Sequence, residues 1–250
     1  MSGPLNVLKN TQIIILGVCI AFATIISALI ISKGMVEFKK FSEQVIEVTG
    51  SAEKRITSDY IVWECHFSRC APVLKDAYAM LEEDLKKVKK YLLAQGIKES
   101  EIYIYPVSTK LMYKKTEKGY DTNEVENYCV SQRIKVESYD VPKVDSVARC
   151  STELIKQGIQ FFSEPPKYFY TKLDTLKVEM LKEATANAKQ RAINIARSTG
   201  NTIGSIRSAR MGVFQINPVT STDVSWYGNN DTSSLEKKVM AVVKVKFSIK

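Results

Sequence analysis

The sequence predicts an α+β protein in which a mostly antiparallel sheet body follows a single N-terminal membrane helix. Three observations support this: a long uncharged segment near the N-terminus, several segments with alternating apolar and polar residues, and segments with apolar residues every three or four positions. Alternation is typical of strands, and the longer spacing is typical of amphipathic helices. The predicted order of elements in the body is β-β-α-β-β-α-β-α-β-β. This mixture of hairpins and crossovers argues against a doubly wound nucleotide-binding fold.

The composition is that of an ordinary globular protein. The chain has 250 residues, of which 45% are hydrophobic and 25% charged. These values exclude a disordered tail, a collagen-like fibre and a disulfide miniprotein. The formal net charge of +9 is spread along the chain, without a dense run of Lys and Arg interleaved with aromatic residues. We therefore expect no nucleic-acid partner.

The first element is an apolar segment from Thr11 to Ser32 that contains no charged residue. A helix of this length spans roughly 33 Å, enough to cross a hydrocarbon core of about 30 Å. It is longer than a typical signal-peptide core, and Ser27-Ala28-Leu29 is followed by two isoleucines rather than by a clean cleavage site. We expect an uncleaved transmembrane anchor at 11–32, between a short tail at 1–10 and a linker at 33–41. A cleaved signal peptide and a buried core helix are the alternatives.

The charges around this segment set its orientation only weakly. Lys9 lies on one side, and Lys33, Lys39 and Lys40 lie on the other, so the positive-inside rule leans toward keeping the larger part inside. A single N-terminal anchor usually exports the part of the chain on its C-terminal side. On that ground we expect a single-pass protein whose body, residues 42–250, lies on the extracytoplasmic side.

The body begins with two alternating segments, 44–57 and 60–69, which we interpret as an antiparallel hairpin around Thr57-Ser58-Asp59. A helix comes next, opened by Pro72 and closed by Gly96. Its apolar stripe comprises Leu74, Ala77, Leu81, Leu85, Val88 and Leu92. The opposite face is expected to be solvated and carries Glu82, Glu83, Asp84, Lys86, Lys87, Lys89 and Lys90.

The rest of the body alternates between predicted strands, helices and polar loops. In order, these are strands at 102–114 and 125–137 around a loop at 116–123, a helix at 141–157, a strand at 159–170, a helix at 173–198, and strands at 202–216 and 239–249 around a loop at 217–234. Pro165-Pro166 predicts an edge strand or a break within 159–170. Gly200-Asn201 predicts the end of the last helix.

One side of that last helix is smooth, because small residues recur at a spacing of four. They are Ala184, Ala188, Ala192 and Ala196. Residues four apart share a helix face, so another backbone can approach this one closely. The chain's own sheet and a second copy of the chain are the two alternative partners for this packing face.

The sequence contains no recognisable catalytic or metal site. Its one histidine, His66, lies in the middle of a predicted strand, and a single histidine excludes a multi-histidine metal site. The motifs GxSxG, HExxH, GxGxxG and the P-loop are absent, and Gly200 to Gly204 follows a helix instead of opening one. We expect a non-enzymatic protein with no catalytic residues, no cofactor and no metal, and its small-molecule ligand is unknown.

Five cysteines remain to be explained. Cys19 lies within the expected anchor, whereas Cys65, Cys70, Cys129 and Cys150 belong to the body. In an exported body these four could form two disulfides, in any of three connectivities. Free thiols are equally consistent with the sequence, and the isolated spacing argues against zinc.

The body resembles the SIMPL-domain (YggE-like) family. The segment Val45–Glu53 followed by Ser58–Val62 resembles the family's V-x-G-x-G/A strand and P-D-x-A turn, with Ser51 and Ser58 in place of the usual Gly and Pro. Three later segments also resemble the family: Leu92–Ile104, Tyr128–Val136, and the helix Ala184–Ala196 with Gly200. The similarity covers nearly all of residues 42–250.

The resemblance implies an exported α+β protein. Relatives assemble into large ring-like or channel-like oligomers and have been linked to protection from oxidative stress, and a domain of this type in animals associates with a signalling kinase. The family supplies no catalytic residue. We therefore expect a membrane-anchored, self-assembling envelope scaffold on the outer side of a bacterial cytoplasmic membrane. The alternative is an exported binding protein or a redox-responsive factor acting through the body cysteines.

Overall fold

The computed structural model describes the backbone of residues 5–249 and the side chains of residues 15–39 and 44–249. The first four residues of the expected N-terminal tail lie outside this range. The chain divides into two compact units, one formed by Met1–Gly50, Thr185–Met211 and Val243–Lys250, and the other by Ser51–Ala184 and Gly212–Val242. Helices are combined with antiparallel sheets, which confirms the α+β class.

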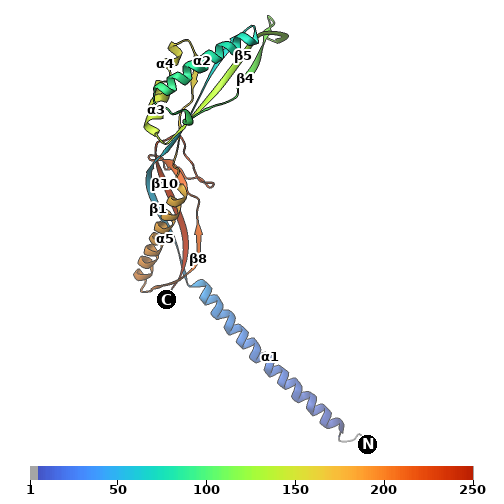
Figure 1. The fold of residues 1–250 in the computed structure, drawn as a ribbon. Helices are drawn as coiled ribbons and strands as arrows, with labels where there is room; N and C mark the ends of the chain where they lie inside the picture. Colours follow the sequence, from blue (N-terminus) through green and yellow to red (C-terminus); the bar gives the residue numbers. More distant parts are fainter. Residues whose placement is uncertain (1–4, 250) are drawn as a thin grey trace. The chain divides into compact units, whose positions relative to one another are not determined.

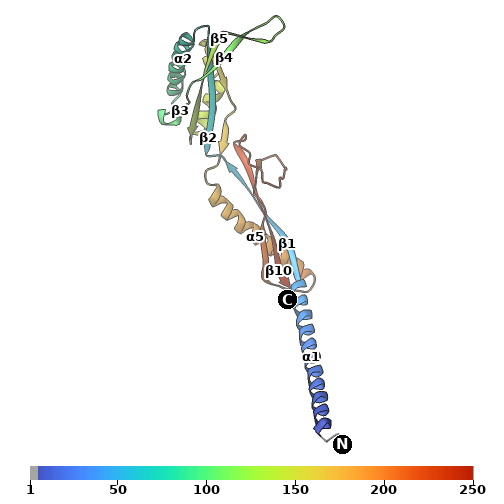
Figure 2. The same cartoon turned by 90° about the vertical axis from the view of Figure 1, so that its right-hand side faces the viewer.

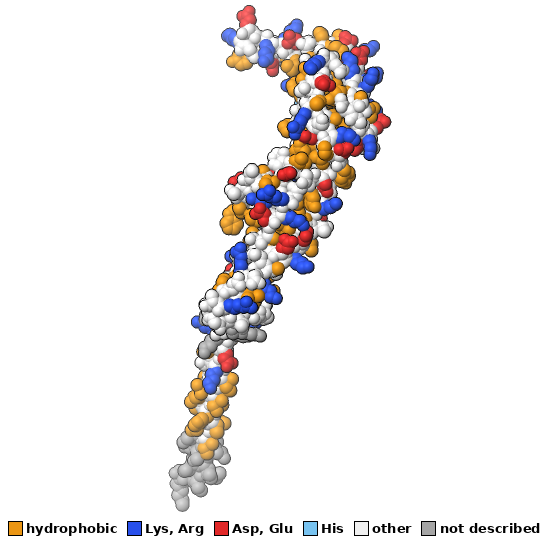
Figure 3. Space-filling view, turned by 90° about the vertical axis from the view of Figure 1, so that its left-hand side faces the viewer, with side chains coloured by type: hydrophobic (Ala, Val, Ile, Leu, Met, Phe, Trp, Pro, Cys, Tyr) orange, Lys and Arg blue, Asp and Glu red, His pale blue; other side chains and the backbone are white. Residues whose placement is uncertain are grey.

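The N-terminal segment is one continuous helix, α1 (Leu5–Glu43), which includes the expected anchor and continues through the expected linker. Its section Ile15–Lys39 has a mean hydropathy of 2.6, and none of the most apolar stretch is buried within the chain. Figure 3 shows hydrophobic side chains dominating the visible face of this helix. Among the residues that the structure describes, one helix is thus long and apolar enough to cross a membrane. Gln44 alone separates α1 from the first strand.

The first sheet has four strands in the order β1-β10-β8, with β9 also paired to β10. The strands are β1 (Val45–Thr57), β8 (Ile203–Met211), β9 (Gln215–Pro218) and β10 (Glu236–Ile249). Every second side chain of β10 from Val239 to Phe247 is buried, as the period of a strand requires.

The long helix α5 (Leu173–Ser198) has the predicted bounds. It ends before Gly200, whose φ of +74° is the left-handed conformation that favours glycine after a helix. Figures 1 and 2 both show α5 beside β1 and β10, and the Arg191 guanidinium donates to the Thr49 carbonyl oxygen at 3.1 Å. The four alanines of the smooth row are each 0% exposed. The row therefore packs within the chain, which leaves no alanine surface for a second copy.

The second sheet has six strands in the order β3-β5-β2-β6, with β4 paired to β5 and β7 paired to β2. Its strands are β2 (Tyr60–Ala71), β3 (Ile102–Ile104), β4 (Ser108–Lys115), β5 (Asp121–Ser138), β6 (Gln160–Ser163) and β7 (Lys167–Phe169). The accompanying helices are α2 (Leu74–Ala94), η1 (Glu99–Glu101), α3 (Val141–Cys150) and α4 (Glu153–Lys156).

Helices α2 and α3 pack on one face of this sheet, around β2 and β5. The core side of β2 carries Ile61, Trp63, Cys65 and Phe67, all fully buried. Successive residues of a strand point to opposite faces, so Glu64 and His66 lie on the side of the sheet opposite α2 and α3. We call that side, with Glu64, His66, Arg133, Lys135 and Phe162, the open face.

The predicted hairpin between residues 44–57 and 60–69 is wrong. Both segments are strands, but β1 and β2 belong to different sheets. The two residues between them bond to different strand ends: the Ser58 amide donates to Leu235, and the Asp59 amide donates to Phe169. The connection Ser58-Asp59 also lacks the glycine or asparagine pair that favours a two-residue hairpin turn.

Four other predicted elements are interrupted. The strand at 202–216 is divided into β8 and β9 at residues 212–214. The strand at 102–114 is divided into β3 and β4 at Tyr105-Pro106-Val107, and the helix at 141–157 is divided into α3 and α4 at Ser151-Thr152. The break expected at Pro165-Pro166 is confirmed, since it separates β6 from β7.

Candidate functional site

The open face contains a hollow of about 440 Å³ at the break between β3 and β4. Pro106 has no amide hydrogen to continue the strand, and the chain leaves the edge of β5 there. Tyr105 stays attached to β5, because its amide donates to the Arg133 carbonyl and its own carbonyl accepts from the Gln132 side chain, each at 3.0 Å. The polar and aromatic lining consists of His66, Tyr105, Ser108, Ser131, Gln132 and Arg133.

A row of flat side chains crosses the open face at this level. His66 is directly opposite Arg133 on β5 and Phe162 on β6. The His66 and Phe162 rings are stacked, with centroids 4.8 Å apart and an interplanar angle of 12°. The Arg133 guanidinium lies 5.9 Å from the Tyr105 ring centroid. This row presents stacking surfaces and one cation to the solvent.

The charges of the hollow favour an anionic or planar ligand. Arg133 supplies a guanidinium, Ser108 and Ser131 supply hydroxyl groups, and no carboxylate lines the hollow. Guanidinium groups bind carboxylates and phosphates through paired hydrogen bonds. One carboxylate competes for Arg133, because Glu64 lies 3.4 Å from it on the open face.

The hollow also holds a histidine and two serines, residue types that occur in hydrolytic centres. A nucleophilic serine needs a base within hydrogen-bond reach. Within residues 44–249, His66 makes no hydrogen bond to Ser108 or Ser131.

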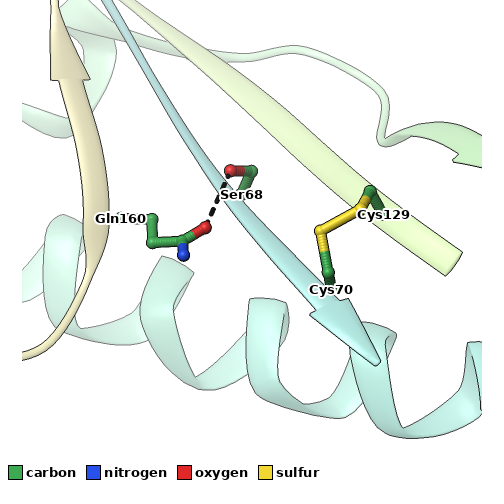
Figure 4. The surroundings of a disulfide bond; sticks show 4 residues. All are labelled: Ser68, Cys70, Cys129 and Gln160. Carbon is green, nitrogen blue, oxygen red and sulfur yellow. Dashed lines mark hydrogen bonds between the residues drawn. A yellow bond between two sulfur atoms is a disulfide. The ribbon is translucent and has the colours of Figure 1, made fainter. Parts of the chain in front are cut away.

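The structure joins two of the four body cysteines. Cys70 and Cys129 are directly opposite on β2 and β5, with Cα atoms 4.1 Å apart, and form a disulfide. Figure 4 shows this bond beside Ser68, whose hydroxyl donates to the Gln160 side chain at 3.4 Å. Because Cys65 and Cys70 are an odd number of residues apart on one strand, they point to opposite faces and cannot pair.

The other cysteines are free thiols with different surroundings. Cys65 is fully buried in the core, and burial raises the pKa of its thiol to about 12. Cys150 is exposed at the end of α3, and Cys19 lies in α1. The structure therefore has one disulfide where the sequence allowed two.

Sequence reasoning missed a buried ion pair beneath the open face. Asp84, expected on a solvated face, is 1% exposed and turns toward the sheet. Its carboxylate accepts two hydrogen bonds from Arg69, at 2.5 and 2.9 Å, and Arg69 also donates to the Gly158 carbonyl at 2.7 Å. The available signal was Arg69 itself, which occupies a core-facing position in the alternation of β2.

The comparisons with known proteins agree with the sequence resemblance. A family model described as "SIMPL: Protein of unknown function (DUF541)" matches residues 46–247. The matched range includes nearly all of both sheets and excludes α1. A search of curated proteins finds no match to the chain.

Proposed function

The chain belongs to the SIMPL family, and from this premise we propose that it is a non-enzymatic envelope scaffold that is anchored in a bacterial cytoplasmic membrane and self-assembles. Helix α1 is the observation that carries the proposal. Its apolar side chains have no protein partner within the described chain, and insertion in lipid is the usual way to bury such a helix. A body held at a membrane is confined with its copies, so even weak contacts between bodies are strengthened.

Self-assembly is supported by the edges of the four-stranded sheet. In the order β1-β10-β8, both β1 and β8 have one side without a partner strand among the described residues. Unpaired edges offer backbone donors and acceptors to another chain. Two different edges on one subunit favour head-to-tail contacts, which close into rings when the rotation permits.

The Cys70–Cys129 disulfide supports an extracytoplasmic body, because disulfides persist in oxidising compartments. Exposed Cys150 provides the test of orientation. A membrane-impermeant maleimide added to intact spheroplasts should label Cys150, and a Cys150→Ser variant should lose that label. Labelling that requires lysis of the spheroplasts would place the body in the cytoplasm and contradict the proposal.

Assembly is tested by light scattering on detergent-solubilised full-length protein and on residues 36–250, at tens of micromolar. We expect masses well above that of a 28.2 kDa monomer. Monomers in both samples would disprove self-assembly, and assembly of the full-length form alone would assign it to the anchor.

Matched variants locate the contact. Ile206 on β8 and Ile195 on α5 are 54% and 48% exposed. A charge on an edge strand opposes pairing, so Ile206→Lys should reduce the mass and Ile195→Lys should not. A role in stress protection, which the resemblance implies, belongs to the same proposal: a strain carrying Ile206→Lys should be as sensitive to peroxide as a deletion strain.

A second function is favoured by the hollow on the open face. With Arg133, His66 and stacked rings but no carboxylate in its lining, it fits an extracytoplasmic binding protein for anionic small molecules. Screening carboxylates and phosphates by thermal shift against the parent and Arg133→Gln tests it. Stabilisation that disappears in Arg133→Gln would support this function.

A further inference from the structure

The loop that joins β9 to β10, residues 219–235, holds two aromatic side chains almost completely in solvent. Trp226 is 95% exposed and Tyr227 is 96% exposed. Large aromatic rings ordinarily contribute to a core or an interface, where each buries a large apolar area. These two consecutive rings contribute to no packing within the described chain, so the fold does not explain them.

The loop is held in one conformation by buried polar contacts. Gln215 is 2% exposed, and its side-chain oxygen accepts from the Ser225 and Asn229 amides at 3.2 and 3.0 Å. Its side-chain nitrogen donates to the Ser225 carbonyl at 2.7 Å. Gly228 has φ +84°, and a Cβ there would lie 2.7 Å from the Phe214 carbonyl oxygen. The turn that carries the two rings is therefore ordered before any ligand arrives, which lowers the entropy lost on binding.

A polar hollow of about 390 Å³ lies in the same loop. Its polar lining consists of Asn217, Ser221, Asp223, Asn229, Asn230 and Asp231. The side-chain nitrogen of Asn217 donates to the Asp223 carbonyl oxygen at 2.6 Å. The side-chain oxygen of Asn217 can therefore accept a hydrogen bond from a ligand. The Asn230 side chain makes no hydrogen bond within the part of the chain that the structure describes. The lining is thus rich in acceptors for a ligand that donates hydrogen bonds.

The charge of this loop selects the class of ligand. Residues 219–235 contain two acidic residues, Asp223 and Asp231, and no Lys or Arg, although the chain carries +9 overall. Nucleic acids and anionic lipid headgroups require basic contacts. A metal ion is also disfavoured, because no group of three or more His, Cys, Asp or Glu side chains suited to a metal occurs among the residues searched. Two carboxylates, several acceptor oxygens and no basic residue instead favour a neutral ligand rich in hydroxyl donors, such as a polyol.

We propose that the β9–β10 loop is a binding site for neutral glycans. The apolar C–H face of one sugar ring stacks on Trp226 or Tyr227, and hydroxyl groups of the glycan donate to the carboxylate and amide oxygens of the hollow in the same loop. This site is separate from the anion-binding hollow and from the sheet edges of the proposed scaffold, so it adds a ligand that neither function includes.

Trp226 provides its own readout, because the chain has two tryptophans and the other, Trp63, is fully buried. We would titrate the detergent-solubilised full-length protein with chitotetraose, cellotetraose and maltotetraose. At least one should produce a saturable blue shift of the emission and protect Trp226 from acrylamide quenching. Calorimetry on Trp226→Ala and Tyr227→Ala should show affinity lowered about tenfold or more in at least one variant.

The control is Tyr139→Ala, which removes another exposed tyrosine, 72% exposed, from outside the loop. Its affinity should equal that of the parent. No saturable binding at millimolar sugar, or binding that both loop variants retain, would overturn the proposal. A blue shift caused by phosphatidylglycerol nanodiscs without sugar would instead assign the rings to a lipid surface. A smaller oligomer in Trp226→Ala would assign the two rings to a contact with a second copy. Either the lipid result or the oligomer result would overturn the glycan proposal.

Discussion

Reduction of the Cys70–Cys129 disulfide should destabilise the unit that contains the six-stranded sheet. The two cysteines are 59 positions apart in sequence, so the bond closes a loop of about 60 residues in the unfolded chain. The chain-entropy relation assigns such a loop roughly 14 cal/mol/K, which is about 4 kcal/mol at 25 °C. Measured disulfides often stabilise by less, so this value is an upper limit.

The assay is urea unfolding of the full-length protein in detergent, followed by the fluorescence of Trp63, which is buried on β2 in the same unit. With a slope of about 3 kcal/mol/M, a loss of 4 kcal/mol lowers the midpoint by roughly 1 M. The Cys70→Ser/Cys129→Ser double variant should unfold at the lowered midpoint with or without reductant. Cys150→Ser, which removes an unpaired thiol, should behave as the parent does.

Thiol titration gives an independent result for the same bond. In denaturant without reductant, the titrated thiols should be those of Cys19, Cys65 and Cys150, and after reduction all five cysteines should react. Five reactive thiols before reduction, or a midpoint unaffected by reductant, would refute the reasoning.

Three further predictions concern the interior of the body. Asp84→Ala leaves the Arg69 guanidinium without its carboxylate and should lower the free energy of unfolding by about 3 kcal/mol. Because one-quarter of the Arg69 side chain is exposed, contact with water should reduce this loss somewhat. Adding Arg69→Met should recover part of that loss in urea unfolding, and no recovery would show that the pair is not the cause. Ala188→Leu overpacks a fully buried position and should cost about 1–3 kcal/mol in thermal unfolding; an unchanged melting temperature would contradict the tight packing of this row within the chain. Because burial raises the pKa of Cys65 from its ordinary value of 9.0 to about 12, the unfolded chain ionises first as the pH rises through this window, so this thiol should make the protein less stable there. Comparing the alkaline pH dependence of unfolding with that of Cys65→Ala measures the effect, and identical profiles would contradict it.

Local periodicity predicted the kind of each element well, because it reports which side chains are buried. The bounds of α5 were predicted because apolar and small residues recur along it and Gly200 ends it. Local periodicity does not specify which strand pairs with which. Alternation showed that β1 and β2 are strands, but hydrogen bonds to Leu235 and Phe169, far away in sequence, decide that they do not form a hairpin.

The candidate sites were less predictable, because they depend on contacts between distant segments. The Cys70–Cys129 pair results from the register of β2 with β5, which no local pattern specifies. Asp84 resembled the charged residues around it in sequence and is distinguished by its contact with Arg69. Likewise, the sequence predicted only a polar loop at 217–234, whereas the contacts of Gln215 with that loop and the exposure of Trp226 appear only in the fold.

Under the proposed function, the junction between α1 and the body affects how long the body stays attached to the membrane. Proteases cut segments that are exposed and unstructured, and Gln44 is the one residue between α1 and β1. Even this residue is engaged, because its carbonyl oxygen accepts a hydrogen bond from the Ile249 amide at 3.1 Å. A protease would have to unwind the end of α1 or pull β1 from its sheet before it could cleave there. If α1 is the proposed anchor, the folded body should therefore resist proteolytic release from it.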